Sequence, residues 1–498
     1  MTSPSPYPAP RTPRPRPARA RLRSRLTATA AVAVSLGLVA SAPQPEALGI
    51  GDRLFPTLGN PGYDVLRYAI DLRYGGDNTR PLEAGTHITA RVTGDRLERL
   101  NLDFANGTVR EARIDGERVP WTSVGEDIVL SPDRELKRGD VVRIDVRHTS
   151  PTSGARPSGW IRTERDGLVM ANQADAAHRV FPANDHPSDK AQFTFRITAP
   201  TGFTAVASGR RAGERTHGDT VTRTYRTVRP MATELAQVAI GRSVVVRDEG
   251  PGGLPLRHVV PEQHRAALEP WLERTPEHLR WMREKVGAYP FENYGLLVAE
   301  ADLGFALETQ TLSLFSVDFL TNPRYPAWHR EAVMIHELAH HWYGNSVSPR
   351  RWDDLWLSEG HATWYEWRWA AEHGGPSLAR LARKAYEASD AWRRDYGPPA
   401  RIHRPEDDDK LGIFRPVVYE GSAVALYALH QRIGARAFDE LQRTWVERHA
   451  HGVASTADFV ALASEVAGED LTAFLHAWLY GERTPPMPGH PDWRGTAR

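Results

Sequence analysis

The sequence predicts two folded parts in series, an N-terminal β-sandwich or saddle and then a mainly helical domain with a few strands. Between residues 63 and 245 apolar residues recur with period two, as in Leu66, Tyr68 and Ile70, and turn-rich stretches separate the runs. From Pro261 onward the apolar residues recur with helical spacing. A chain of 498 residues, 40% of them hydrophobic and 25% charged, is long enough to bury two or three cores.

The N-terminal residues have the features of an export signal. Seven arginines and no acidic residue precede Leu26, and residues 26–42 are rich in Ala, Val and Leu and end in Ala40-Ser41-Ala42. This order of a basic region, a short apolar region and small residues predicts a secretory signal that is removed after about Ala42. The apolar region is too short for a stable membrane span. A disordered tail rich in proline and arginine, followed by an unrelated apolar helix, is the alternative.

Composition excludes several classes of partner and linkage. The net charge of +1 argues against a nucleic-acid partner. The chain has no cysteine, so it can carry neither a disulfide nor a lipid attached to Cys. No second apolar stretch reaches the length of a membrane helix. We therefore expect a secreted, extracellular protein without a stable membrane anchor, and the sequence leaves its oligomeric state open.

The most specific feature is a His-Glu-x-x-His motif at His336, Glu337 and His340 in a predicted helix. Four residues make just over one helical turn, so the two histidines share a face while Glu337 lies about 100° round the axis. Glu359, in a second helix predicted over about residues 358–373, adds a carboxylate. Two imidazoles and one carboxylate leave a position on zinc for water, and Glu337 can accept its proton. The sequence thus predicts one catalytic Zn²⁺ held by His336, His340 and Glu359, with Glu337 as base.

These residues, with Gly344-Asn345 after the first helix and Trp356-Leu357-Ser358-Glu359-Gly360 around the third ligand, resemble the M1 family of zinc aminopeptidases, in the gluzincin group. Ser358 stands where that family has Asn. The resemblance implies a β-saddle domain followed by a thermolysin-like metallopeptidase domain, in a short form without the family's large helical C-terminal domain. The expected divisions are a signal at 1–42, the β domain at 43–247, the catalytic domain at 248–485 and a polar tail at 486–498.

The resemblance extends to three more segments. The Phe-Ala-Leu-Glu-Thr segment ending at Thr309 resembles the family's Gly-x-Met-Glu-Asn, which implies that Glu308 binds the free α-ammonium of a peptide. The Tyr-Glu-Gly-Ser segment resembles Tyr-Glu-Lys-Gly, so Tyr419 would donate a hydrogen bond to the oxyanion. Gln173 falls where the family has a Glu or Gln that helps to hold the amine. Glu366 lies two turns after Glu359 and is either a carboxylate that orients a ligand histidine or a solvated helix residue.

Together these features predict a zinc-dependent aminopeptidase that removes N-terminal residues from peptides by metal-activated water. Two other zinc hydrolases remain as alternatives, an epoxide hydrolase-like enzyme and an endopeptidase. A non-catalytic binding protein on the same fold is a weaker alternative, because base, ligands and tyrosine are all retained. The acidic run at 406–409 is interpreted as a solvated loop, since it lacks the spacing of a calcium site. The preferred first residue and the natural substrate are not encoded in any motif.

Overall fold

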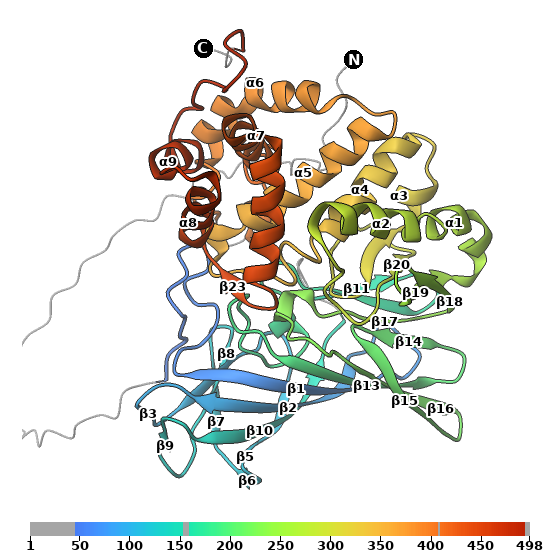
Figure 1. Ribbon diagram of the computed structural model, residues 1–498. Coiled ribbons are helices and arrows are strands. Elements are labelled where there is room, and N and C mark those ends of the chain that lie inside the picture. Colours follow the sequence, from blue (N-terminus) through green and yellow to red (C-terminus); the bar gives the residue numbers. More distant parts are fainter. Residues whose placement is uncertain (1–44, 153–158, 407–408, 494–498) are drawn as a thin grey trace, which may run out of the picture.

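The computed structural model describes residues 45–152, 159–406 and 409–493. The expected signal at 1–42 lies outside these residues. A β-rich part and a helical part lie against each other, the first in the lower half and the second in the upper half of Figure 1. The order of β domain and then helical domain agrees with the sequence prediction.

The β domain is built around one large twisted sheet. Its order is β15 (Arg210–His217), β16 (Thr220–Arg226), β13 (Gln192–Pro200), β1 (Tyr63–Arg73), β2 (Leu82–Val92), β10 (Val141–Ser150), β5 (Val109–Ile114) and β6 (Glu117–Arg118). A four-stranded sheet has the order β11 (Gly159–Thr163), β12 (Gly167–Ala171), β17 (Val238–Gly241) and β14 (Thr204–Ala207). Smaller sheets pair β4 (Leu100–Asp103) with β8 (Asp127–Leu130) and β7 (Trp121–Val124), and β3 (Arg96–Leu97) with β9 (Leu136–Lys137).

The period-two pattern of β1 is confirmed except at its start. Tyr68, Ile70 and Leu72 are buried, and the alternating residues Ala69 and Asp71 are only partly buried. The expectation that Leu66 belongs to the same buried row is wrong. A register shift between Val65 and Arg67 in the pairing with β2 adds one residue to β1, and Leu66 is this residue. A bulge of this kind moves every later side chain to the opposite face.

The helical domain contains one four-stranded sheet and nine α-helices among the described residues. The sheet has the order β18 (Ser243–Gly250), β19 (Leu254–Pro261), β20 (Leu296–Ala299) and β21 (Ser313–Ser316), and β22 (Ser348–Pro349) pairs with β23 (Val453–Ala454). The helices are α1 (Arg265–Leu272), α2 (Thr275–Val286), α3 (Val317–Thr321), α4 (Ala327–Ala339), α5 (Trp356–Glu372), α6 (Leu378–Tyr396), α7 (Glu420–Arg448), α8 (Thr456–Ala467) and α9 (Thr472–Tyr480). The division expected between residues 247 and 248 falls inside β18, whose pairing attaches it to this domain.

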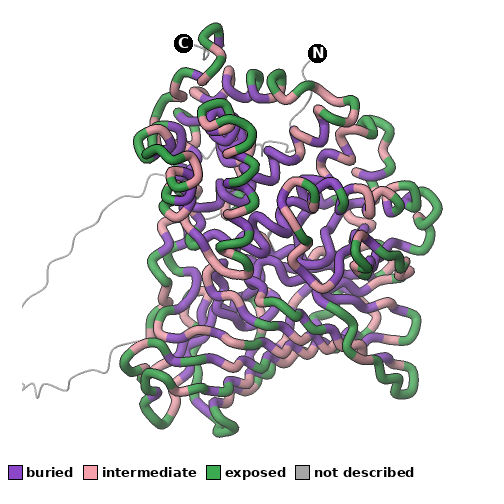
Figure 2. Tube along the Cα trace, in the orientation of Figure 1, coloured by how far each residue is buried: buried purple, intermediate pink, exposed green. Residues whose placement is uncertain are grey.

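One core fills the β domain and continues onto the sheet of the helical domain, where Val259, Leu297 and Leu314 belong to it, and a second core lies mainly among the helices. Figure 2 shows the buried residues concentrated in the interior of both halves and the exposed residues at the periphery. A third, smaller apolar cluster joins the first described residues to segments of both domains. The expectation of a polar tail from residue 486 needs correction: Met487 and Trp493 are buried in the core of the helical domain. Within the described residues, no helix is both long and apolar enough to cross a membrane.

Candidate active site

The zinc motif is placed by two packed helices. The last turn of α4 carries His336 and Glu337, and His340 directly follows it, while Glu359 lies in the first turn of α5. One donor atom from each of His336, His340 and Glu359 lies within 4.8 Å of the others, and all three residues are buried. The structure therefore brings together the three residues that the sequence predicts as ligands.

Hydrogen bonds to the Nδ1 atoms orient both imidazoles. Nδ1 of His336 lies 3.0 Å from Oε2 of Glu366, and Nδ1 of His340 lies 2.9 Å from Oγ of Ser358. Oγ of Ser358 also donates to the backbone oxygen of Tyr343 at 3.0 Å. When Nδ1 is the donor, Nε2 carries a lone pair, which is the form of histidine that binds a metal. Both Nε2 atoms face Glu359, at 3.3 Å and 3.4 Å from its Oε2.

These donors fit a zinc ion. Oε2 of Glu359 is fully buried, yet no described residue donates a hydrogen bond to it. A buried carboxylate oxygen without a donor is costly unless a cation binds there. Two imidazoles and one carboxylate are a common set of ligands for catalytic zinc. The cluster is thus suited to hold Zn²⁺ through Nε2 of both histidines and the Glu359 carboxylate.

The electrostatic environment separates the roles of the two glutamates. Burial raises the pKa of Glu359, but the two histidines outweigh this and hold that pKa at about 2. Burial raises the pKa of Glu337 to about 8, although the same histidines act in the opposite direction. Glu337 also has a buried oxygen, Oε2, to which no described residue donates. This undonated oxygen, beside the residues suited to hold the metal, is placed to accept a proton.

Glu308 meets the site from the segment before β21. One carboxylate oxygen of Glu308 lies within 4.8 Å of ligand-type atoms of Glu337 and His340. Its Oε1 accepts a hydrogen bond of 2.8 Å from Nε2 of Gln173, which comes from the β domain. The structure therefore brings Glu308 and Gln173 together, as the sequence predicts, although 135 residues separate them.

Tyr419 lies beside His336. Its ring stacks on the His336 imidazole with 6.0 Å between ring centroids and 23° between ring planes. Tyr419 precedes the first residue of α7 and, like Gln173 and Glu366, is only half-buried. Three partly exposed polar side chains thus lie next to the buried ligand residues or to Glu308.

Two residues support the site in ways that the sequence alone does not reveal. Ser358 departs from the family pattern, yet its hydroxyl orients His340. Nδ2 of Asn345, just beyond α4, donates a hydrogen bond of 2.7 Å to the backbone oxygen of Glu308. For Ser358, the only indication in the sequence is that a short polar side chain stands next to the ligand Glu359.

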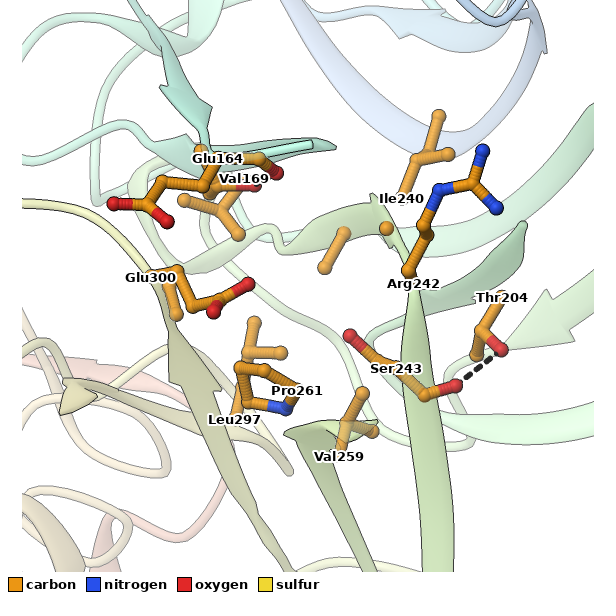
Figure 3. Close-up of a pocket in the computed structure, with 14 residues that line it drawn as sticks. Glu164, Val169, Thr204, Ile240, Arg242, Ser243, Val259, Pro261, Leu297 and Glu300 are labelled. Atoms are coloured by element: carbon orange, nitrogen blue, oxygen red, sulfur yellow. Dashed lines mark hydrogen bonds between the residues drawn. The ribbon is translucent and has the colours of Figure 1, made fainter. Parts of the chain in front are cut away.

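A separate pocket lies at the junction of the domains and has a different character. Figure 3 shows Glu164 and Glu300 on one side of it and Arg242 on the other, with Thr204 bonded to the backbone oxygen of Ser243. Its volume of about 20 Å³ is enough for a water molecule but not for a peptide. None of its lining residues belongs to the His-His-Glu cluster.

Comparison with known proteins agrees with this geometry. Residues 271–478 match the sequence profile described as the peptidase family M1 domain, and this range contains His336, Glu337, His340 and Glu359. These residues therefore form a peptidase family M1 domain. It is 27% identical over 439 residues to aminopeptidase N of Streptomyces lividans, covering 83% of this chain and 50% of the relative. It is 25% identical over 310 residues to leukotriene A-4 hydrolase of Xenopus laevis, covering 58% of this chain and 49% of the relative.

Solved structures of M1 enzymes show the same two-domain fold. The M1 zinc metallopeptidase of Deinococcus radiodurans superimposes with a TM-score of 0.75 at 27% identity, covering 88% of this chain and 99% of that one. A mutant of that M1 enzyme was solved with a Tyr-Ser-Ala substrate. This chain spans about half the length of aminopeptidase N and leukotriene A-4 hydrolase but nearly the whole of the bacterial metallopeptidase.

Proposed function

We propose that this M1 protein is a zinc aminopeptidase that removes single residues from the free N-terminus of peptides. The observation that carries the proposal is the short distance between Glu308 and the catalytic centre, within 4.8 Å of Glu337 and His340 atoms. The α-amine of a peptide is two bonds from the carbonyl carbon of the first residue. An ammonium held by Glu308 therefore brings the first peptide bond, and no later one, to the zinc cluster.

The chain's own residues supply most of the chemistry. Zinc, when held by His336, His340 and Glu359, supplies a Lewis acid that polarises the carbonyl and acidifies water. Glu337 accepts the proton of the attacking water and returns it to the departing amine. Tyr419 donates a hydrogen bond to the oxyanion that develops on the scissile carbonyl.

The amine-binding groups complete the arrangement. The side-chain amide of Gln173 donates one hydrogen to Glu308. The amide oxygen of Gln173 is then left to accept a hydrogen bond from the substrate ammonium. The second oxygen of Glu308 can accept a hydrogen bond from the same ammonium. Both acceptors are preorganised, because the hydrogen bond between Gln173 and Glu308 fixes the two side chains relative to each other. A substrate with a blocked N-terminus has no cation for this carboxylate, which disfavours an endopeptidase.

The relatives support this choice. Aminopeptidase N and a metallopeptidase crystallised with Tyr-Ser-Ala both point to peptides with a free amine. Leukotriene A-4 hydrolase is the relative that supports epoxide hydrolysis as a second candidate.

The test compares an unblocked aminoacyl anilide with its N-acetylated form, using wild type, Glu308→Gln and the surface control Glu83→Gln. Glu308→Gln removes the charge but keeps the shape, and should lower kcat/KM on the unblocked substrate by about 30-fold or more, the usual cost of breaking a buried charge pair. Its rate on the blocked substrate should not change. Equal losses on both substrates would show that Glu308 supports the structure and does not bind the amine. A wild type that cleaves blocked and free peptides equally would be an endopeptidase.

We also propose that the protein is exported after removal of residues 1–42. The basic, apolar and small-residue order of this segment supports the proposal. N-terminal sequencing of protein from culture medium should give a start near Pro43. An intact Met1 on protein retained in the cytosol would contradict it.

A further inference from the structure

The segment that precedes β1 is bound to both domains. Figure 1 shows this blue segment rising from the β domain to the helical domain. Asp52 and Arg53 carry its polar contacts, and Leu54, Phe55 and Leu58 carry its apolar ones. We infer that residues 52–58 form an interdomain clasp, and that Asp52 and Arg53 are positioning residues for the catalytic groups.

Asp52 joins the two domains through one buried carboxylate. Its Oδ2 accepts a hydrogen bond of 2.8 Å from the backbone N–H of Trp352 in the helical domain. The same oxygen lies 3.2 Å from Nε2 of His186 in the β domain. Nδ1 of His186 accepts from the backbone of Ser188, so its proton is on Nε2 and is donated to Asp52. Both domains thus donate to one oxygen atom that is shielded from water.

The position of Trp352 connects this contact to the zinc ligand. Trp352 begins the 3-10 turn Trp352–Asp354 that leads into α5, the helix that carries Glu359. The first N–H groups of a helical segment lack partners within it, and Asp52 supplies one. The clasp therefore fixes the start of the helix that presents the third ligand.

Arg53 makes a second interdomain connection beside the first. Its Nε donates to Oδ2 of Asp353 at 3.0 Å, and its Nη2 donates to Oδ1 of the same carboxylate. Nη2 also donates to the backbone oxygen of Ile402 at 2.7 Å. A bidentate guanidinium–carboxylate pair fixes orientation as well as distance. Arg53 therefore ties the start of α5 to the loop that follows α6.

The apolar part of the clasp reaches the other two catalytic segments. Leu54, Phe55 and Leu58 form one buried cluster with residues drawn from both domains, namely Ala174, Trp352, Leu355, Ile402, Ile413, Val417 and Val418. Phe55 packs edge-on against Trp352 at 5.6 Å between centroids. Ala174 is the neighbour of Gln173, and Val418 is the neighbour of Tyr419. One buried cluster thus contains the clasp together with residues next to the amine-binding and oxyanion-binding groups and at the start of the metal-binding helix.

A lysine strengthens the same junction. Nζ of Lys410, in the loop that leads to Tyr419, lies 2.6 Å from Oδ2 of Asp175, two residues after Gln173. The two domains also share the core around β19, β20 and β21, so the clasp is a local connection at the start of α5. Loss of the clasp should therefore shift the start of α5 more than it alters the fold of either domain.

The test is a double-mutant cycle on Arg53 and Asp353, with Arg138→Ala as control. Arg138 also donates through two nitrogen atoms to an aspartate, although both reach Oδ1 of Asp95, and this pair lies within the β domain. Arg53→Ala and Asp353→Ala should each lower kcat on the unblocked anilide at least tenfold, because small displacements of catalytic groups are costly. The double variant should lose no more than either single variant. KM should change less than kcat, since the zinc ligand and the oxyanion donor act at the reacting centre.

A second measurement does not depend on the proposed function. Arg53→Ala should lose zinc to a chelator at least tenfold faster than wild type, because the helix carrying Glu359 is no longer held, whereas Arg138→Ala should match wild type. If wild type is inactive on aminoacyl anilides, the proposed function fails, while this rate still tests the clasp. The inference would be overturned if both Arg53→Ala and Asp353→Ala had the same kcat and the same rate of zinc loss as wild type.

Discussion

Nε2 of Gln173 donates a hydrogen bond of 2.8 Å to Oε1 of Glu308, so one residue from each domain meets at the point where a substrate amine would bind. The two residues come from different domains: Gln173 follows β12 of the β domain, and Glu308 precedes β21 of the helical domain. The geometry of the amine site therefore depends on how the two domains are packed. This dependence is the physical reason why contacts far from zinc can alter turnover.

Gln173→Ala should weaken the amine site without removing it. The variant loses one hydrogen bond to a charged group, which is worth about 1.5 kcal/mol, so kcat/KM on an unblocked anilide should fall about tenfold. The rate on the N-acetylated anilide should stay the same. Gln192→Ala, a change on the surface of β13, serves as control. A loss as large as that of Glu308→Gln would show that Gln173 mainly fixes the carboxylate.

Removal of a ligand and removal of the base should have opposite effects on metal content. Glu359→Ala leaves two imidazoles, an incomplete shell, and should abolish stoichiometric zinc. Glu337→Gln leaves all three ligands and should retain zinc, but lose turnover by several powers of ten because no group takes the proton. Metal analysis of both purified variants checks the assignment. Zinc retained by the first variant, or lost by the second, would reverse the two roles.

The sequence predicted the zinc cluster well because local geometry decides most of it. Helical periodicity alone places His336 and His340 on one face, and only Glu359 had to be brought in from a second helix. The order of a β domain and a helical domain was likewise readable from the change in apolar period. The β-bulge at Leu66 was not, because a one-residue insertion depends on the partner strand and leaves no mark in composition.

The residues that the sequence did not reveal act between segments. Asp52 and Arg53 look like solvated charges in the sequence, and only the packed domains give them partners about 300 residues away. The buried position of Trp493 was missed for a related reason, since a proline-rich segment near a C-terminus resembles a free tail until a hydrophobic surface is available to it. Pattern analysis reads neighbours along the chain and has no access to such contacts.

Two histidines on the large sheet should affect stability with opposite dependence on pH. Burial lowers the pKa of His148 to about 4, below the value of about 6.5 in an unfolded chain. Below that value the unfolded state binds the proton more readily, so wild type loses stability relative to His148→Gln as pH falls from 6.5 towards 4. The loss should be about 1 kcal/mol for each pH unit, measured as the difference in unfolding free energy between the two proteins.

His87 on β2 provides the opposite case. Hydrogen bonds and charge from Asp71 and Asp145 raise the pKa of His87 to about 8, against the effect of burial. The stabilising contribution is complete below about 6.5 and is lost as pH rises through 8. Wild type should therefore lose its advantage over His87→Gln between pH 6.5 and 9, by a small amount because the pair is half exposed. Parallel pH curves for either variant and wild type would exclude the assigned shift.

Ser358 should control how tightly zinc is held. Gly344 leaves the space that the Ser358 hydroxyl occupies. Oγ of Ser358 lies 2.9 Å from Nδ1 of His340 and 3.0 Å from the backbone oxygen of Tyr343, so it fixes the orientation of the imidazole. A Cβ placed on Gly344 would lie 2.3 Å from this hydroxyl, and the backbone there has a φ of +120°, which favours glycine.

Ser358→Ala should therefore keep the fold and weaken zinc by about 10- to 100-fold, the usual effect of losing a hydrogen bond to a ligand histidine. Zinc affinity is measured by competition with a chelator of known affinity, and activity is then assayed with zinc in excess. Because the ligands themselves remain, activity at saturating zinc should recover largely. Gly344→Ala should weaken zinc at least as much, since the added carbon forces the hydroxyl away from His340. An unchanged zinc affinity in Ser358→Ala would mean that the backbone oxygen of Tyr343, 3.2 Å from Nδ1, orients His340 without help.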